Sequence, residues 1–427
     1  MRTLVLISSL VVMLLAGVCL AHEPDAPRAA AATGPWDWLQ SSSLTNDWFG
    51  LGEKAEQQGV TVELTLTQVY QRNLHGGLST HRRSGRYTGA YDLEMTLDLE
   101  KILKLPGASL YAHGEGGWSD GLGDTSVGGL FDVNDSAAGY RSLDLTELYY
   151  EQKLLDGRVQ FRVGKLDVSG GFECRGCPAS FDGNAYANDE TTQFLNGALV
   201  NNPTIPFPSK GLGAVVHVEP VDGWYVSGGL ADAQADKRET GFRTAFHGRD
   251  EYFAIFETGV TPVLPSARGP LQGTYRAGLW YDPREKDRLD GNGSERDDAG
   301  FYLSFDQQVW RERAVEGDSQ GLGVFARYGW ADDDVNEIKC FWSTGASYQG
   351  LLPGRDDDVL GFGVAQGGLS ERAGHSASHE TAMELFYNVQ VTPWFQIGPS
   401  VQYVFNPGGD RTAGDAVVTG LRALIRF

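Results

Sequence analysis

The sequence predicts an all-β fold, a transmembrane antiparallel β-barrel of about 16 strands preceded by one short N-terminal helix. Three observations support this prediction. Apolar and polar side chains alternate with a period of two along most of the chain, the chain begins with an export signal, and it ends in an aromatic residue, Phe427. The composition, with 56 glycines in 427 residues and 11% aromatic residues, is typical of an ordered β-rich protein rather than a disordered chain.

The charge of the chain excludes some functions. There are 35 Lys and Arg residues against 56 Asp and Glu residues, which gives a net charge of −21. A nucleic-acid partner is therefore not expected, because its binder needs a basic face that displaces counterions. After the leader the chain has no apolar run of about 18 residues, so a helical membrane protein is excluded as well. No motif indicates a cofactor.

Residues 1–21 are predicted to be a secretory signal peptide. Arg2 gives a basic start, an apolar run extends from Leu4 to Leu15, and small residues precede the expected cleavage site after Ala21. The apolar run is too short to remain as a membrane span. The mature protein is therefore expected to be exported.

The cysteines raise two further questions. A lipoprotein signal at Cys19 is an alternative, although Val18 before it is unfavourable. Export permits disulfide bonds, and Cys174 and Cys177 lie in a Gly- and Pro-rich loop, where they are a candidate disulfide. A redox site would need this pair at a junction between a strand and a helix, and the pattern predicts no such junction there.

After a flexible segment over 22–43, one helix is predicted from Leu44 to Gln58. Asn46 or Asp47 is suited to cap it, and apolar side chains recur on one face. The remainder of the domain, which we place at 44–427, is expected to contain strands only. Their predicted centres lie near residues 66, 95, 113, 146, 161, 215, 226, 255, 277, 304, 325, 342, 362, 385, 400 and 421.

Strict alternation gives each strand one apolar and one polar face, which fits either a soluble β-sandwich or propeller or a membrane barrel. The polar face carries charges such as Glu94, Arg162 and Arg276, which a dry core would not accept unpaired. Trp and Tyr gather at strand ends, as the membrane interface favours. Both features favour the barrel, with charged side chains that point into a water-filled lumen and need no special pairing.

The residues that alternate toward the lumen include candidate contacts for a solute. Arginine presents a planar fork of donors that suits hydroxyl pairs and anions, and an aromatic ring can lie against the apolar face of a sugar. Hydration and bracing of the wall is the alternative role for each residue. The candidate pore-lining residues are Arg162, Arg276, Arg327, Arg422, Glu94 and Trp280.

Metal sites are not predicted. The acidic run from Asp332 to Asp334 is predicted to be a solvated turn. The loop that starts at Asp290 lacks the glycine and the glutamate that an EF-hand requires. His375 and His379 share no helical face, so a zinc site is not expected either.

Several segments resemble the carbohydrate-selective, OprB-type outer-membrane porins. The resemblance extends over about residues 44–427, and its C-terminal third is the most specific part. It is carried by the segments Leu44–Leu51, Gln58–Thr61, Gly164–Asp167, Phe194–Asn196, Asn202–Pro206, Gly350–Asp358, Glu384–Tyr387, Thr392–Trp394, Pro399–Val404, Asn406–Gly408 and Gly420–Arg422.

The resemblance implies a sixteen-stranded barrel in the outer membrane of a Gram-negative bacterium. It also implies passive diffusion of monosaccharides and small oligosaccharides through an arginine-bearing constriction, with an inward loop within 168–210. Small sugars and outer-membrane lipid are then the expected partners, and the resemblance leaves monomer and trimer open.

Two other functions stay open at this stage. A structural outer-membrane barrel with a plugged lumen would have the same pattern. A secreted glycan hydrolase is also compatible with the abundant carboxylates, although one of them would have to be desolvated. We expect a porin without enzymatic activity.

Overall fold

The computed structural model describes residues 37–427, except 138, 140–141, 174–193 and 315–319. The predicted signal peptide, most of the N-terminal segment and the candidate disulfide between Cys174 and Cys177 lie outside the described residues. Among the described residues Cys340 is a free cysteine.

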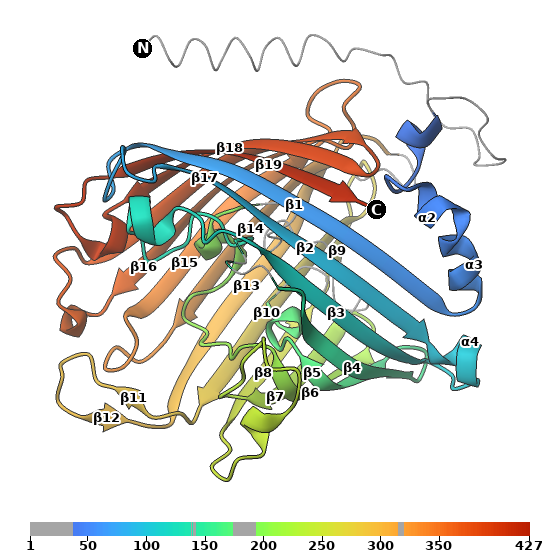
Figure 1. The fold of residues 1–427 in the computed structure, drawn as a ribbon, viewed down its shortest axis with the longest axis horizontal. Coiled ribbons are helices and arrows are strands. Elements are labelled where there is room, and N and C mark those ends of the chain that lie inside the picture. The colour runs from blue at the N-terminus through green and yellow to red at the C-terminus, as the bar shows by residue number, and fades with distance from the viewer. Residues whose placement is uncertain (1–36, 138, 140–141, 174–193, 315–319) are drawn as a thin grey trace.

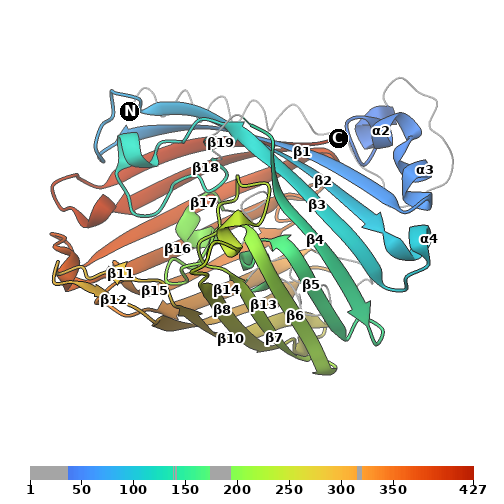
Figure 2. The ribbon, with the colours of Figure 1, turned by 60° about the horizontal axis from the view of Figure 1, so that its bottom comes forward.

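The chain forms a closed antiparallel β-barrel (Figures 1 and 2). The main sheet has seventeen strands, and β1 pairs with both β2 and β19, which closes it. One of the seventeen, β9 (Val263–Leu264), is a two-residue appendage of β10, so sixteen strands make the wall. A separate hairpin, β11 (Lys286–Asp287) and β12 (Ser294–Glu295), lies in a loop.

The wall strands follow one another around the barrel in sequence order. They are β1 (Val60–His75), β2 (Gly85–Asp98), β3 (Ala108–Trp118), β4 (Asp144–Leu154), β5 (Val159–Leu166), β6 (Gly211–Val221), β7 (Trp224–Asp232), β8 (Tyr252–Val260), β10 (Leu271–Asp282), β13 (Asp298–Arg311), β14 (Gly321–Trp330), β15 (Ile338–Gln349), β16 (Val359–Leu369), β17 (His379–Thr392), β18 (Phe395–Phe405) and β19 (Ala416–Arg426). All sixteen predicted strand centres fall inside these strands, so the predicted fold class is confirmed.

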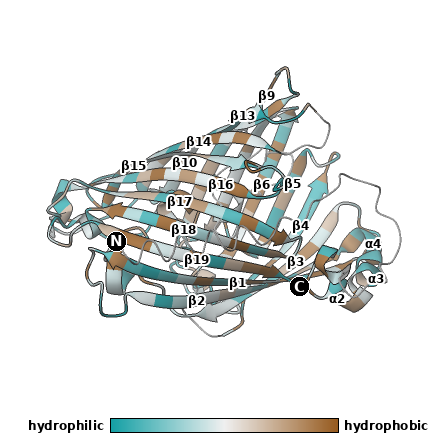
Figure 3. Ribbon diagram, turned by 90° about the horizontal axis from the view of Figure 1, so that it is seen from above, coloured by the Kyte–Doolittle hydropathy of each residue, from teal (hydrophilic) through white to brown (hydrophobic). Residues whose placement is uncertain are grey.

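The two-residue alternation separates the two faces of the wall. In β10 every second residue from Tyr275 to Tyr281 is exposed on the outer face, whereas Arg276 and Trp280 between them are buried on the inner face. A shift of register by one residue would exchange these faces, so the apolar phase fixes the pairing. Figure 3 shows hydrophobic and hydrophilic positions alternating along the strands.

The outer face carries large apolar side chains. Aromatic residues mark the strand ends, among them Trp224 at the start of β7, Trp310 near the end of β13 and Trp330 at the end of β14. In the described part of the chain, no helix combines the length and the apolar character that a membrane-crossing helix needs.

Short helices lie at the barrel end that also holds the C-terminus (Figure 1). They are η1 (Asp37–Gln40), α2 (Asn46–Gly50), α3 (Gly52–Gln57) and α4 (Leu99–Leu103). The indole of Trp38 in η1 stacks on that of Trp394, with ring centroids 5.3 Å apart, which attaches the N-terminal segment to the barrel.

The prediction of one continuous helix over Leu44–Gln58 is wrong. Its first half has left-handed backbone angles at Asp47, Trp48 and Phe49, so α2 and α3 are separate pieces. The alternation of apolar and polar residues continues through Leu99 and Glu100, but strand β2 ends at Asp98. The Asp98 side chain accepts hydrogen bonds from the backbone N–H groups of Glu100 and Lys101 and caps α4.

The described parts of two long loops fold back against the inner wall. The first inner loop joins β3 to β4, is described over 119–137, 139 and 142–143, and contains η2 (Gly123–Val127). The second inner loop joins β5 to β6, is described over 167–173 and 194–210, and contains η3 (Ser169–Gly171) and α5 (Gly197–Val200). Other loops carry η4 (Arg243–Ala245), η5 (Glu371–Ala373) and η6 (Pro407–Gly409).

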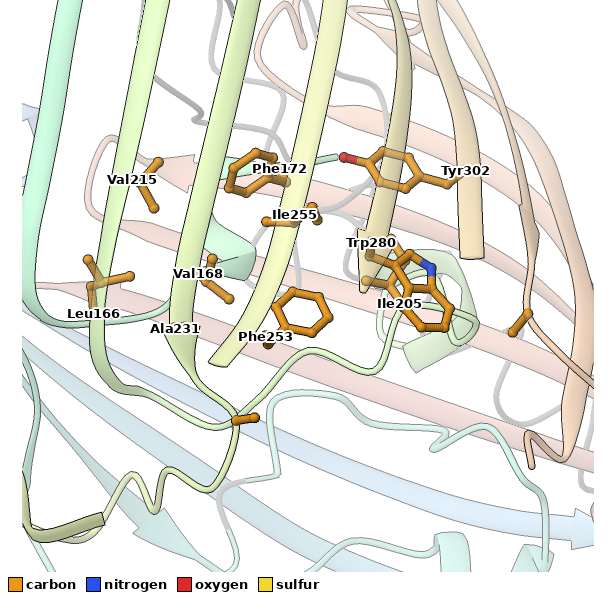
Figure 4. Packing of buried hydrophobic residues seen from close by; sticks show 12 residues of the cluster. Leu166, Val168, Phe172, Ile205, Val215, Ala231, Phe253, Ile255, Trp280 and Tyr302 are labelled. Atoms are coloured by element: carbon orange, nitrogen blue, oxygen red, sulfur yellow. The ribbon is translucent and has the colours of Figure 1, made fainter. Parts of the chain in front are cut away.

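Three apolar clusters attach these loops to the wall. In the first cluster, Val168, Phe172 and Ile205 of the second inner loop pack with Ile255 and Trp280 of the wall (Figure 4). The second cluster joins both inner loops to β14–β17, and the third joins the first inner loop to β18 and β19. Part of the lumen is therefore filled with packed side chains.

Candidate functional site

The inner wall divides into two regions. We call the inner faces of β2–β5 the open wall, because most of their charged and tyrosine side chains at mid-strand remain partly exposed. We call the inner faces of β1, β6–β8, β10 and β13–β19 the covered wall, because the inner loops bury most of their side chains. The members of the open wall are Asp92, Glu94, Tyr111, His113, Glu115, Glu147, Tyr149, Glu151 and Arg162.

A pair of tyrosines forms the centre of the open wall. The rings of Tyr111 and Tyr149 stack with centroids 4.9 Å apart and an interplanar angle of 29°. The Tyr111 hydroxyl donates to Glu94 Oε2 at 2.7 Å, and the Arg162 guanidinium lies 5.5 Å from the centroid of Tyr149. Arg162 Nε also donates to Glu151 Oε2 at 2.8 Å. Glu94 therefore holds the hydroxyl edge of Tyr111, and Arg162 covers part of the face of Tyr149.

Strand register brings these groups together. Tyr111 of β3 is paired with Tyr149 of β4, and Glu151 of β4 is paired with Arg162 of β5. Side chains that are directly opposite on one face of an antiparallel pair lie about 5 Å apart at Cβ. The pairing alone thus places an aromatic pair beside an ion pair.

A second charged group continues the open wall. His113 lies between two carboxylates, with Nε2 3.1 Å from Asp92 Oδ1 and Nδ1 3.4 Å from Glu147 Oε1. At the end of the second inner loop, Lys210 Nζ lies 2.9 Å from Glu115 Oε2. Burial opposes the charge of Lys210, but the nearby carboxylates, Glu147 first, outweigh it and raise the pKa of the amine above its usual range. Lys210 therefore stays a cation.

The covered wall holds its charges away from water. Arg276 donates to Asp306 Oδ2 at 3.1 Å, and its side chain is 1% exposed. Arg422 is buried and donates to Asn388 Oδ1 at 3.2 Å. Trp280 is buried in the first apolar cluster.

Arg327 contacts the second inner loop directly. Its two terminal nitrogens donate to three carbonyl oxygens of α5. The distances are 3.0 Å to Ala198, 2.8 Å to Leu199 and 3.2 Å to Val200. Its Nε donates to Ser343 Oγ at 2.9 Å. The guanidinium thus joins β14 and β15 to the loop.

The six candidate pore-lining residues therefore separate. All six lie on the inner face, but only Glu94 and Arg162 belong to the open wall. The expectation that inward charges are hydrated and need no pairing is wrong for the covered wall, because the inner loops exclude water there and each arginine has found protein partners. Contact of any of the six with a solute stays a prediction.

Two features were missed by the sequence analysis. Tyr111 and Tyr149 share the inward phase with His113 and Glu147, and that phase is the signal that could have found them. The first inner loop was also missed, although the gap of 25 residues between β3 and β4, from 119 to 143, is far longer than a strand turn.

The acidic run from Asp332 to Asp334 forms a convergent carboxylate group within the described part of the chain. Asp334 forms ion pairs with Arg288 at 2.9 Å and with Arg372. These contacts join three loops and offset part of the negative charge.

The comparisons with known proteins agree with this geometry. The sequence profile of the carbohydrate-selective porins of the OprB family matches residues 82–427. The chain belongs to this family. Porin B of Pseudomonas aeruginosa is 24% identical over 93% of this chain and 93% of its own length, and the putative porin QuiX of Acinetobacter baylyi is 23% identical over 91% and 94%.

A solved structure shows the same fold. The high-pH structure of OprB from Pseudomonas putida superposes with a TM-score of 0.77 at 22% sequence identity, covering 91% of this chain and 99% of that chain. The predicted family, the barrel, the porin function and the outer-membrane location are confirmed. Membership of a porin family implies a channel rather than an enzyme, and the family's selectivity suggests sugars as solutes.

Barrels of this membrane have short turns on the periplasmic side and longer loops on the extracellular side. The shortest strand connections, 155–158, 222–223 and 393–394, all lie at the helix-bearing end, and the longest, 119–143 and 167–210, lie at the opposite end. The helices α2, α3 and α4 accordingly belong at the periplasmic mouth.

Proposed function

We propose that this OprB-family porin passes small sugars by passive diffusion and that its open wall is the surface along which they move. The observation that carries the proposal is the stacked pair Tyr111–Tyr149, with Glu94 at the Tyr111 hydroxyl and Arg162 over the Tyr149 ring. Ring faces offer apolar contact to the C–H groups of a sugar, and charged donors and acceptors bind its hydroxyls.

Conduction also requires that the solute leaves. A pore passes a solute when its binding is favourable enough for entry and weak enough for release. The charged groups of the open wall already have protein partners, such as Glu151 for Arg162, so a sugar hydroxyl exchanges one hydrogen bond for another. Weak, repeated contact is the result we expect.

The arginines of the covered wall have a different role in this proposal. Arg276, Arg327 and Arg422 and the indole of Trp280 act behind the inner loops, which they hold in place, and affect the solute through the shape of the passage. The apolar outer face contacts outer-membrane lipid, and export depends on the signal peptide at residues 1–21.

The test uses the purified, detergent-extracted protein in planar bilayers. Heat-dependent gel mobility first establishes that the barrel is folded. Conductance steps that decrease in the presence of millimolar to molar glucose are expected. Folded protein that gives no conductance steps would overturn the proposal.

A plugged structural barrel is the second candidate, and the packing of both inner loops against the wall favours it. Liposome swelling separates the two. A porin lets monosaccharides enter proteoliposomes, whereas a plugged barrel gives the same swelling rate as liposomes without protein.

A further inference from the structure

Two glutamates on the inner face of β17 contact both inner loops. Glu380 and Glu384 are four residues apart, so the strand period places them on the same face. Their exposed fractions are 0% and 1%. Carboxylates are rarely buried this completely without strong partners, and here the partners are backbone N–H groups of loops.

Glu384 binds the second inner loop. Its carboxylate accepts hydrogen bonds from the backbone N–H of Asn196 at 2.8 Å and from that of Leu195 at 3.0 and 3.1 Å. Arg422 on β19 adds electrostatic attraction to this carboxylate. The turn of α5 follows directly, and Arg327 binds its carbonyl oxygens from the other side. The same short turn is thus held by an acceptor at its start and a donor at its end.

Glu380 binds the first inner loop and a third loop. It accepts hydrogen bonds from the backbone N–H of Leu130 at 2.8 Å, of Phe131 at 3.0 Å and of Gly408 at 2.6 Å. Gly408 belongs to η6 between β18 and β19. One carboxylate therefore fixes two loops that are more than 270 residues apart in the sequence.

The two inner loops also bind each other. The backbone N–H of Gly197 donates to the Asp132 carbonyl at 2.7 Å, and that of Asp135 donates to the Leu195 carbonyl at 2.9 Å. Gln402 connects them further, because it accepts from Asn196 Nδ2 at 3.0 Å and donates to the Val133 carbonyl at 2.8 Å. The described parts of the loops form one unit, and their contacts with β17 include the two carboxylates and the apolar cluster around Phe131 and Phe194.

We propose that Glu380 and Glu384 are positioning residues that set the size limit of the pore by holding the two inner loops against β17. The proposal rests on the proposed porin function. A carboxylate has two acceptor oxygens, whereas glutamine has one and presents an NH₂ donor in place of the other. In Glu380→Gln at least one buried backbone N–H therefore loses its acceptor, because the three N–H groups divide between both oxygens. In Glu384→Gln a single amide oxygen can still accept from Leu195 and Asn196, but the negative charge that strengthens both hydrogen bonds is lost. The size of the side chain is conserved in both variants.

The experiment measures proteoliposome swelling with sugars from mono- to tetrasaccharide. In the double variant Glu380→Gln/Glu384→Gln, the ratio of the tetrasaccharide rate to the monosaccharide rate is expected to rise by about tenfold, because the charge-assisted hydrogen bonds to both loops are lost or weakened. Open-channel current noise should rise with it. The control is Glu371→Gln, an exposed glutamate in η5 directly before β17, whose rate ratio should equal that of the native protein.

The outcomes separate the two proposals. A native protein without monosaccharide uptake overturns the proposed function itself. Normal monosaccharide uptake with an unchanged rate ratio in the folded double variant overturns the positioning role. If the double variant fails to give a heat-modifiable barrel, Arg327→Lys releases the α5 turn from its carbonyl side, and the same rise in the rate ratio is then required.

Discussion

The open wall and the covered wall carry similar charged residues in different surroundings. On the open wall, the side chain of Arg162 is 19% exposed and pairs with Glu151 of the neighbouring strand. On the covered wall, Arg327 is 4% exposed and binds three carbonyl oxygens of a loop. Residues that point inward from the strands therefore do not share one role. A loop from elsewhere in the chain decides whether an inward charge is in contact with water.

The largest expected effect is on the covered wall. Arg327→Ala leaves three buried carbonyl oxygens without their donor and should lower the free energy of unfolding by about 3–5 kcal/mol. The urea midpoint of the folded barrel, read by gel mobility, measures this loss. Arg158→Ala, at an exposed pair with Asp222, is the matched control and should cost less than about 1 kcal/mol. Equal losses in the two variants would show that the burial of Arg327 against the loop adds nothing to the stability of the barrel.

The covered wall should also respond to pH through Glu173 of the second inner loop. Burial raises the pKa of this carboxyl to about 7, with Arg327 opposing the shift. Because the folded pKa exceeds the ordinary value of 4.5, the stabilising protonated form dominates at low pH. Its contribution is complete below about pH 4.5 and is lost as the pH rises through 7, by about 3 kcal/mol in all.

Unfolding at pH 5 and pH 8 measures that contribution. Glu173→Gln mimics the protonated carboxyl and should remove most of the difference between the two pH values. If the native protein and this variant show the same pH dependence, the carboxyl of Glu173 is not the group responsible.

A smaller effect is expected on the open wall. Tyr149→Ala removes half of the stacked pair and should weaken the block of conductance by glucose by about three- to tenfold, the value of one aromatic contact. Tyr150 is the next residue on β4 and lies on the opposite phase, so Tyr150→Ala is the control and should leave the block unchanged. Sugar titration of single-channel conductance distinguishes them.

The smallest expected effect concerns ions. Glu151→Gln removes one carboxylate from the partly exposed wall and should shift the permeability ratio toward anions by about twofold at 0.1 M salt. Screening should abolish most of the shift at 1 M salt, where the Debye length is about 3 Å. A shift that is independent of salt would mean that the residue acts through structure and not through its charge.

The sequence predicted much of the fold because the strands depend on a local pattern. A period of two assigns each side chain to a face, as in β10, where it correctly placed Arg276 and Trp280 on the inner side. The pattern failed where local backbone geometry departs from it, at Asp47–Phe49 and at the end of β2, where Asp98 caps a helix.

The sequence by itself determined the sixteen strands, their two faces and the family of the protein, since all of these are recorded in residue order. Only the tertiary structure decided which inward residues remain in contact with water. Contacts such as Asn196 with Glu384 and Phe131 with Glu380 join residues 188 and 249 positions apart. No local period encodes a pairing at that separation, because it is the closed barrel that brings the loops onto its inner wall.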